Sequence, residues 1–291
     1  RNSNRTGVFA TGVKLSMPIS APGSAEMDLG RTSLGCVMIG ALQGLRRVFK
    51  WAAASAPPHP AICHVTHPEA GSDWIEGFLR ALVPDRVVEA DVSHTRFTSR
   101  PIATGKVYQS LFLTREQFES ARLPPNCRRF VMIRDLRDTL VSLYFSSPTS
   151  HTITEHALKS HRRILSEVSK EVGLLHLLES ELGRIAQMQW SWIAAREELL
   201  RYEDMRERDE EILAEVLLRR CRIGVDVWHF RETILANRFE TWAGCDEGDS
   251  SDQPQIPGNW RRHFSGRVID QFKKRYGSLL IATGYEKNFR W

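Results

Sequence analysis

The hydrophobic positions of the chain alternate between short continuous runs and stretches with helical spacing. Continuous apolar runs predict buried strands, and three are present, at residues 61–66, 129–133 and 199–202. Each run leads into a segment whose apolar residues recur at spacings of three and four, which predicts a helix. Strands that alternate with helices are typical of a parallel sheet covered by helices on its faces. The pattern therefore predicts an α/β fold.

The predicted helices fill most of the chain between these strands. After the first strand, one helical face is formed by four apolar residues: Ile75, Phe78, Leu79 and Leu82. Further helical segments are expected at 140–145, at 153–200 with breaks at Gly173 and Gly183, at 207–243, and at 266–283. Gly284 fits the position after the last of these helices. Residues 246–257 predict a polar loop.

The first 55 residues have a different character. Residues 1–30 are rich in Ser, Gly, Pro and Thr and predict a loop or partly disordered segment, whereas residues 32–54 have helical spacing. That helix suits either packing or a membrane surface, and packing is the commoner case. Three prolines between residues 56 and 60 end the pattern. We therefore expect an extension at 1–55, partly disordered with one helix, and one domain at 56–291.

The charge, the apolar runs and the cysteines of the chain limit the ligands and the cellular location that we expect. The chain has 40 Lys and Arg against 35 Asp and Glu, a net charge of +5, which suits a nucleotide but is weak for nucleic-acid binding. Its longest apolar run, residues 36–45, is much shorter than the roughly 20 residues of a membrane span. Five widely spaced cysteines with no CxxC pair predict free thiols, no metal site and a cytoplasmic location.

The first candidate site is the turn after the strand at 61–66. Ligands of parallel α/β sheets bind at the carboxyl ends of strands, and a helix N-terminus there offers free N–H groups to phosphate. Gly71, Ser72 and Asp73 form this turn, and Trp74 could stack on a nucleobase. The alternative is an ordinary α/β turn, because one Gly and one Ser are common in such turns.

The second candidate site combines Arg134 with Ser142. Arg134 directly follows the strand at 129–133, and Ser142 lies eight residues later, about two helical turns on. A guanidinium and a hydroxyl in this arrangement could hold a phosphate. The alternative is a structural ion pair between Arg134 and Asp135, Asp138 or Glu203.

Two further segments could add ligand contacts. Tyr202, at the end of the third predicted strand, could present its ring to a base, although a half-buried packing role is commoner for tyrosine. Gly258, Asn259 and Trp260 form a glycine-containing loop before a bulky side chain, which could bind a ligand or simply pack.

Together these segments resemble the sulfotransferases that use a phosphorylated-adenosine sulfate donor. Residues 130–144 are similar to the family's 3′-phosphate segment, and Arg201–Met205 to its Tyr-Glu-Asp segment. Residues 258–264 resemble its Gly-Asp/Asn-Trp element, and Thr283–Glu286 its Leu-Gly-Tyr ending. The four segments occur in the family's order within residues 60–291.

The resemblance implies a P-loop-NTPase-like sulfotransferase fold with a central parallel sheet flanked by helices. It implies sulfuryl transfer from 3′-phosphoadenosine 5′-phosphosulfate to a hydroxyl or amine acceptor, without a metal. Arg134 and Ser142 would hold the 3′-phosphate, and Trp74 and Tyr202 would flank adenine. The remaining residues that it assigns to the donor are Gly71, Ser72, Asp73 and Gly258.

The chain departs from the family pattern at three places. The first loop of the family carries a lysine where this chain has Glu69, and a threonine where it has Asp73. Residues 253–255 read Gln-Pro-Gln where the family has Arg-Lys-Gly, and residues 107–112 lack the family's histidine. A carboxylate at position 69 would repel a phosphosulfate unless it were protonated or turned away.

Replacements for these groups are available in the sequence. A cation could come from one of four residues: Lys106, Arg137, Arg261 and Arg262. A general base could be His67 or His94, or else His151, although an ordinary structural histidine is commoner.

Two other hypotheses follow from the same residues. The chain could be a catalytically inactive binding or scaffold protein, as Glu69 suggests. A kinase-like phosphotransferase is disfavoured because the chain has no Gly-x-x-x-x-Gly-Lys-Ser/Thr motif and no evident acidic metal site.

Overall fold

A computed structural model describes residues 59–89, 94–145, 163–239 and 255–291. All of them belong to one compact unit, Pro57–Trp291. The expected extension at residues 1–55 and its helix lie outside the described residues, as do the histidine at 151 and the loop positions 253 and 254.

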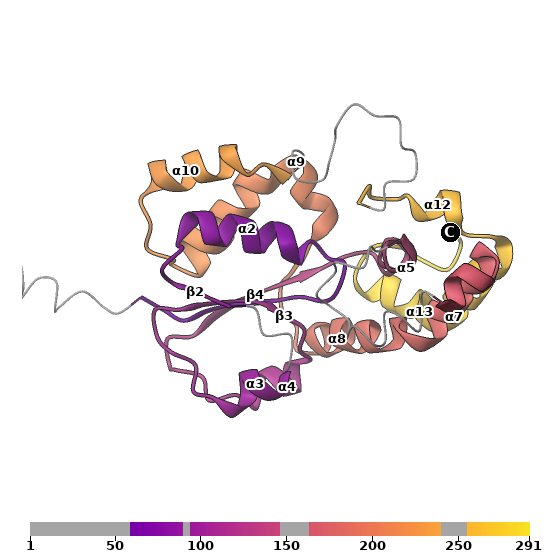
Figure 1. Cartoon of the computed structure of the whole chain (residues 1–291), viewed down its shortest axis with the longest axis horizontal. Helices are drawn as coiled ribbons and strands as arrows, with labels where there is room; N and C mark the ends of the chain where they lie inside the picture. Colours follow the sequence, from indigo (N-terminus) through magenta and orange to yellow (C-terminus); the bar gives the residue numbers. More distant parts are fainter. Residues whose placement is uncertain (1–58, 90–93, 146–162, 240–254) are drawn as a thin grey trace, which may run out of the picture. The chain divides into compact units, whose positions relative to one another are not determined.

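The described unit is built on a five-stranded parallel sheet. The strands are β1 (Ile62–Val65), β2 (Val87–Val88), β3 (Val107–Leu111), β4 (Arg128–Ile133) and β5 (Leu199–Arg201). Their order is β2-β3-β1-β4-β5, and every neighbouring pair is parallel (Figure 1). The predicted α/β fold with a central parallel sheet is confirmed, and three of these strands are those expected from the apolar runs.

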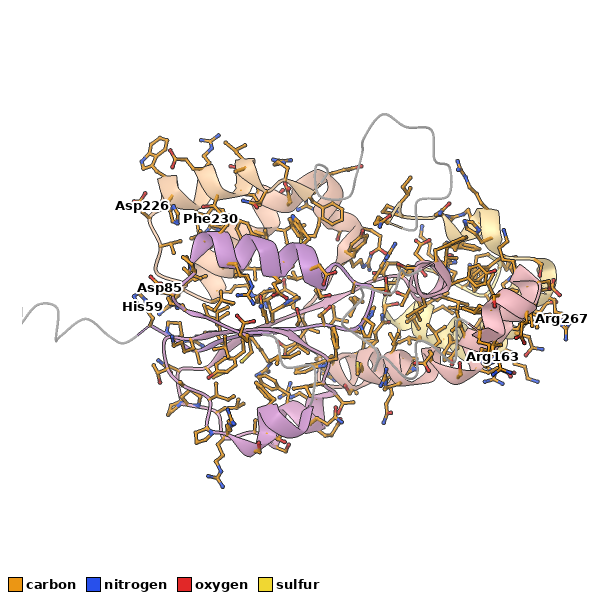
Figure 2. The ribbon with its side chains drawn as sticks, viewed as in Figure 1. His59, Asp85, Arg163, Asp226, Phe230 and Arg267 are labelled. Atoms are coloured by element: carbon orange, nitrogen blue, oxygen red, sulfur yellow. The ribbon has the colours of Figure 1, made fainter. Side chains whose placement is uncertain are left out.

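One face of the sheet is covered by α2 (Ser72–Leu82), α9 (Tyr202–Leu213), the π-helical η1 (Ala214–Arg220) and α10 (Val227–Ala236) (Figure 1). Apolar burial holds this layer, because Ile62 and Phe130 from the sheet share a core with Phe78 of α2. Figure 2 labels Asp226 and Phe230 at the start of α10. The Asp226 carboxylate caps this helix, and the Phe230 ring packs edge-on against Phe78.

The opposite face carries α3 (His94–Ser99), α4 (Arg115–Glu119) and part of α8 (Leu182–Ala194). Its core joins Cys63, Val65 and Val131 of the sheet to Phe118 of α4 and Trp192 of α8. Alternate residues of β1 therefore enter two different cores, as expected for a strand that is covered on both faces.

A helical layer lies beyond the carboxyl ends of the strands. It consists of α5 (Leu136–Phe145), α7 (Lys170–Ser180), α12 (Trp260–His263) and α13 (Gly266–Ala282) (Figure 1). The predicted break at Gly173 is wrong, because Gly173 lies inside α7. A Cβ at this glycine would come within 2.8 Å of the Tyr144 and Leu165 side chains, so the glycine permits close packing against α5.

Two other expectations are corrected by the fold. The helical segment expected at 207–243 is interrupted, since η1 ends at Arg220 and α10 begins at Val227. Tyr202 is the first residue of α9 and follows β5 without a loop. Of the polar loop at 246–257, only residues 255–257 are described.

The strand order determines where a ligand site would be. β1 has β3 on one side and β4 on the other, so the chain passes from one side of β1 to the other between β3 and β4. The turns that follow β1 and β4 meet at the same edge, and such switch points are the usual ligand sites of open parallel sheets. Within the described residues, no helix combines the length and hydrophobicity that crossing a bilayer requires.

Candidate functional site

The turn after β1 is set by two residues with left-handed backbone. Glu69 has φ of 65° and Gly71 has φ of 81°. A Cβ at position 71 would lie 3.0 Å from the Tyr202 ring, so glycine is required by both the backbone and the close approach. Glu69 adopts this conformation despite its Cβ, which costs free energy and indicates that the turn is held by its surroundings.

The helix α2 begins directly after this turn. Its N-cap is Gly71, and no side chain caps the first turn. The N-terminal N–H groups of a helix carry the positive end of its dipole, so this end suits an anion. Ser72 is buried, and its hydroxyl donates to the exposed Asp73 at 3.4 Å, a long hydrogen bond. The Asp73 carboxylate adds a negative charge at the same place.

Arg134 and Ser142 come together at Glu69. The Arg134 guanidinium donates to the Glu69 carbonyl at 2.8 Å, and the Ser142 hydroxyl donates to the Glu69 carboxylate at 2.7 Å. Arg134 is 2% exposed and Ser142 is 4% exposed. The guanidinium and the hydroxyl that the sequence pairs therefore lie on one side of the sheet edge. The carboxylate that Ser142 contacts belongs to the protein itself, and Arg134 contacts the main-chain carbonyl of the same residue.

His67 holds the turns after β1 and β4 together. Its Nε2 accepts from the Arg134 amide at 3.1 Å and contacts the Gln189 side-chain amide at 2.9 Å, while Nδ1 lies 2.8 Å from the Pro68 carbonyl. Burial lowers the pKa of His67 to about 4, and the nearby Arg134 charge adds to this effect. The imidazole is thus neutral near pH 7, and the lone pair that a general base needs is already engaged.

The rings expected to flank adenine are joined by a third aromatic side chain. Phe239 packs edge-on against Trp74 and against Tyr202, with ring centroids 4.9 Å apart in both pairs. The Trp74 indole donates to the Asn237 carbonyl at 2.9 Å, and the Tyr202 hydroxyl donates to the Gln255 carbonyl at 3.0 Å. The Arg134 guanidinium lies 4.4 Å from the centre of the Tyr202 ring, a cation–π contact.

Gly258 is placed beside α5 by Asp138. The Asp138 carboxylate accepts from the Gly258 amide at 2.6 Å and from the Trp260 amide at 2.9 Å. Burial raises the pKa of Asp138, as does the charge of Asp135. Asp138 lies one helical turn before Ser142, so it brings the Gly258 loop to the helix that carries the candidate hydroxyl.

The other candidate cations and bases are distributed differently. Lys106 directly precedes β3 and donates to the Asp85 carbonyl, which places it at the amino edge of the sheet. Arg137 is engaged by Asp135 and Glu286, and Arg261 lies over the Trp260 ring. Arg262 is exposed on α12, and His94 begins α3, although its side chain is outside the described set. Among the described residues, no group of His, Cys, Asp and Glu could hold a metal ion.

Glu203 connects this edge of the sheet to the C-terminal segment. Its carboxylate accepts from the Asp135 amide at 2.9 Å and from the Tyr285 hydroxyl at 2.7 Å. Burial raises the pKa of the Glu203 carboxyl to about 7, although both hydrogen bonds favour its charged form. The Tyr-Glu-Asp and Gly-Tyr segments therefore contact each other through a buried acid.

This raised pKa predicts a pH-dependent stability. Because the folded state holds a proton that an unfolded glutamate releases near pH 4.5, the contribution of Glu203 is present below that pH and is lost as pH rises through 7. Glu203→Gln does not titrate. We expect the stability of the unmodified chain relative to this variant to fall by on the order of 1–3 kcal/mol between pH 5 and 8. Urea unfolding at several pH values measures this difference, and a constant difference would contradict it.

We compared the chain with protein-family models, with curated proteins and with solved structures, and only the solved structures gave a match. No family model matches the chain, and no curated protein matches it either. Among solved structures, it is similar to the mouse sulfotransferase SULT7A1 complexed with PAP, with a TM-score of 0.54. The match covers 78% of this chain and 90% of that one, at 13% sequence identity. The chain has the sulfotransferase fold.

Several residues lie near the candidate site in this fold although no sequence motif indicates a role for them there. Phe239 and Gln189 carry no local motif, and each is recognised only when the fold brings distant segments together. Asp138 lies between Arg134 and Ser142 in the sequence, where its charge suggests an ion pair with Arg134, whereas its carboxylate accepts from the Gly258 amide. Its position one helical turn before Ser142 is the signal that could have indicated a role at the same place.

Proposed function

We propose that this protein is a sulfotransferase that binds 3′-phosphoadenosine 5′-phosphosulfate at the carboxyl edge of its sheet. It would transfer the sulfuryl group to a hydroxyl or amine acceptor. The observation that carries this proposal is that Arg134 and Ser142 meet at one residue, Glu69: the guanidinium donates to its main-chain carbonyl and the hydroxyl donates to its carboxylate. The sulfotransferase fold supports the same assignment of the site.

Donor binding would use groups that the fold already brings together. Arg134 and Ser142 would exchange their contacts with Glu69 for the 3′-phosphate, and the first turn of α2 would face the 5′-phosphosulfate. Adenine would need the space that Phe239 shares with Trp74 and Tyr202, so the ring of Phe239 would move or become one wall of the base site.

The chemistry of transfer would rest on positioning and charge. Negative charge develops on the leaving nucleotide oxygen, and a fixed cation or helix N-terminus beside that oxygen stabilises the transition state. The α2 N-terminus is the positive group that we assign to this task. His67 would be a positioning residue, because its neutral ring fixes the Arg134 backbone and the turn after β1.

A second function is favoured by the carboxylate of Glu69. Its bond to Ser142 places a negative charge where the phosphate would be held, and anions repel one another strongly in a partly buried site. A protein that kept the fold but lost donor binding or catalysis, and acts as a binding or scaffold protein, would retain this contact. The two functions make different predictions for nucleotide binding and turnover.

Donor binding predicts that adenosine 3′,5′-bisphosphate stabilises the folded chain. A ligand at a hundred times its Kd adds about 2.7 kcal/mol, which for a chain of this size corresponds to a melting temperature higher by roughly 5–10 °C. Thermal unfolding with and without the nucleotide measures this shift, and calorimetry gives the Kd. Adenosine 5′-monophosphate, which lacks the 3′-phosphate, should give a much smaller shift.

Single substitutions test whether Arg134 and Ser142 cause the shift in melting temperature. Ser142→Ala should weaken the shift, and Arg134→Ala should abolish it, whereas Arg219→Ala removes an exposed arginine from η1 and should leave it unchanged. No shift at millimolar bisphosphate would contradict donor binding. If the nucleotide binds but labelled sulfate is not transferred to a panel of phenols, alcohols and amines, the binding-protein function is supported instead.

A further inference from the structure

Two cysteines that are distant in sequence have their sulfur atoms in contact. The Sγ atoms of Cys63 and Cys127 are 3.8 Å apart, although the residues are separated by 64 positions. Cys63 lies in β1 opposite Arg129 of β4, and Cys127 comes two residues before that partner. Residues two apart along a strand point to the same face. The sheet register therefore sets these two thiols side by side.

The two thiols have different surroundings. Cys63 is 0% exposed and lies in the central strand, whereas Cys127 is half-buried and ends a turn in which its amide donates to the Pro124 carbonyl. Arg128 and Arg129 follow Cys127 directly, and the Arg129 guanidinium is held by Glu197. One thiol is thus accessible and next to positive charge, and the other is sealed behind it.

This difference gives the thiols different chemical roles. The pKa of the Cys127 thiol is lowered because the Cys63 thiol hydrogen-bonds to its sulfur, and the charges of Arg129 and Arg128 act in the same direction. The same contact, together with burial, raises the pKa of Cys63. Thiolates are the reactive form of cysteine, so Cys127 is the nucleophile of the pair.

We propose that Cys63 and Cys127 are a redox pair, which hydrogen peroxide oxidises to a disulfide that joins β1 to the start of β4 and which a dithiol reduces again. In the first step the Cys127 thiolate attacks the peroxide. An S–O bond forms, the O–O bond breaks, and the leaving hydroxide takes a proton to become water. In the second step the Cys63 sulfur attacks the Cys127 sulfenic acid. An S–S bond forms, the S–O bond breaks, and the Cys63 proton leaves with the hydroxide as a second water.

The required movement is small. A disulfide has an S–S distance of about 2.05 Å, so the sulfur atoms must approach each other by roughly 1.8 Å. Cys63 is fixed by strand pairing on both sides, whereas Cys127 lies where a turn meets β4. A side-chain rotation and a small shift of that turn bring Cys127 to Cys63 without disturbing the central strand.

The bond would act at the edge of the sheet opposite to the candidate nucleotide site. Cys127 precedes the amino end of β4, at the edge where Figure 2 labels His59 and Asp85. The strands that it would join, β1 and β4, lead to Glu69 and Arg134 respectively. Closing a loop of this length restricts the unfolded chain, so we expect the oxidised protein to melt at a higher temperature than the reduced one.

Peptide mapping of the folded, full-length chain tests the proposal. The reduced protein is treated with a small excess of hydrogen peroxide, free thiols are blocked with iodoacetamide, and the protein is digested with trypsin without reductant. Cleavage after Lys and Arg places Cys63 in residues 51–80 and Cys127 in residues 123–128. We expect these two peptides as one linked species, two hydrogen atoms lighter than their sum, which dithiothreitol separates.

Three serine variants show which cysteines form the disulfide and which one reacts first with peroxide. Cys127→Ser and Cys63→Ser should each abolish the linked species, and Cys63→Ser should leave a sulfenic acid at Cys127 that a dimedone probe captures. Cys221→Ser is the matched control, because burial raises the pKa of that thiol to about 12, and it should form the link as the unmodified chain does.

The mapping has outcomes that would overturn the proposal. A folded chain that gives no link between residues 51–80 and 123–128 contradicts it, as does oxidation of Cys127 to the sulfinic acid alone. A disulfide from Cys127 to Cys36 or Cys245 contradicts it as well. The unmodified chain alone decides these cases, so the result holds even if a variant fails to fold. It also does not depend on nucleotide binding.

Discussion

Replacing Glu69 with glutamine is expected to raise the affinity for adenosine 3′,5′-bisphosphate about ten- to a hundredfold. The Glu69 carboxylate accepts from Ser142, so it competes with a phosphate for that hydroxyl and repels it. Removing one like charge near a partly buried anion is worth about 1.4–3 kcal/mol. Glutamine keeps the length of the side chain and an oxygen for Ser142, so the change tests charge rather than shape. Calorimetry measures the Kd of each protein.

The control for this substitution removes the same charge elsewhere. Glu76→Gln, on α2, takes one negative charge from a residue that pairs with Arg80 and does not contact Ser142. It should leave the Kd nearly unchanged. Equal gains in both variants would show a general effect of net charge, and no gain in Glu69→Gln would contradict the competition between carboxylate and phosphate. Glu69→Lys, which places a cation at this turn, should also raise transfer of labelled sulfate if the proposed function holds.

Arg137→Ala is expected to lower the free energy of unfolding by about 3–5 kcal/mol. Arg137 is 2% exposed and donates to the Asp135 carboxylate at 2.6 Å and to Glu286 at 2.5 Å. Its guanidinium also lies over the rings of Trp260 and Trp291, at 4.2 and 4.5 Å. The substitution would leave the buried Asp135 without its cation, and such an unpaired charge is strongly destabilising. Urea denaturation measures the loss.

The control for Arg137→Ala is the same substitution at an arginine that forms an exposed ion pair. Arg208 pairs with Glu211 on the surface of α9, where both side chains are more than half exposed. Arg208→Ala should have little effect on unfolding, because exposed ion pairs are screened by solvent. A similar loss of unfolding free energy in both variants would contradict the expectation that the buried contacts of Arg137 with Asp135 and Glu286 stabilise the fold. Arg137→Lys should recover part of the loss, since lysine keeps the charge but cannot bind Asp135 with two parallel bonds.

The sequence predicts those parts of the fold whose hydrophobic pattern is local and strong. The strands at 129–133 and 61–66 have continuous apolar runs because both of their faces are covered. The hydrophobic pattern does not predict β3, because it contains the buried polar residues Gln109 and Ser110. Ser110 has φ of 55°, and the pairing of β3 with β1 is irregular there, so no simple alternation exists.

The candidate site could be predicted only where its residues share one segment. Arg134 and Ser142 are linked by the geometry of a strand followed by a helix, so their spacing predicts that they lie near each other, and both contact Glu69. The contact between Ser142 and Glu69 joins residues 73 positions apart and requires the left-handed backbone at Glu69. Phe239 meets Trp74 and Tyr202 for the same reason, because tertiary packing and not local pattern brings them together.

The central position of β1 in the sheet also affects the order in which the strands can pair during synthesis. β1 is the first strand of the sheet to leave the ribosome, yet its neighbours β3 and β4 arrive much later, and β5 completes the sheet only at residue 201. Ordering such long intervening segments makes folding slow. Until β5 is added, β4 presents an open edge that can pair with another nascent chain. Pairing of residues 199–201 with β4 is therefore the step that covers this edge.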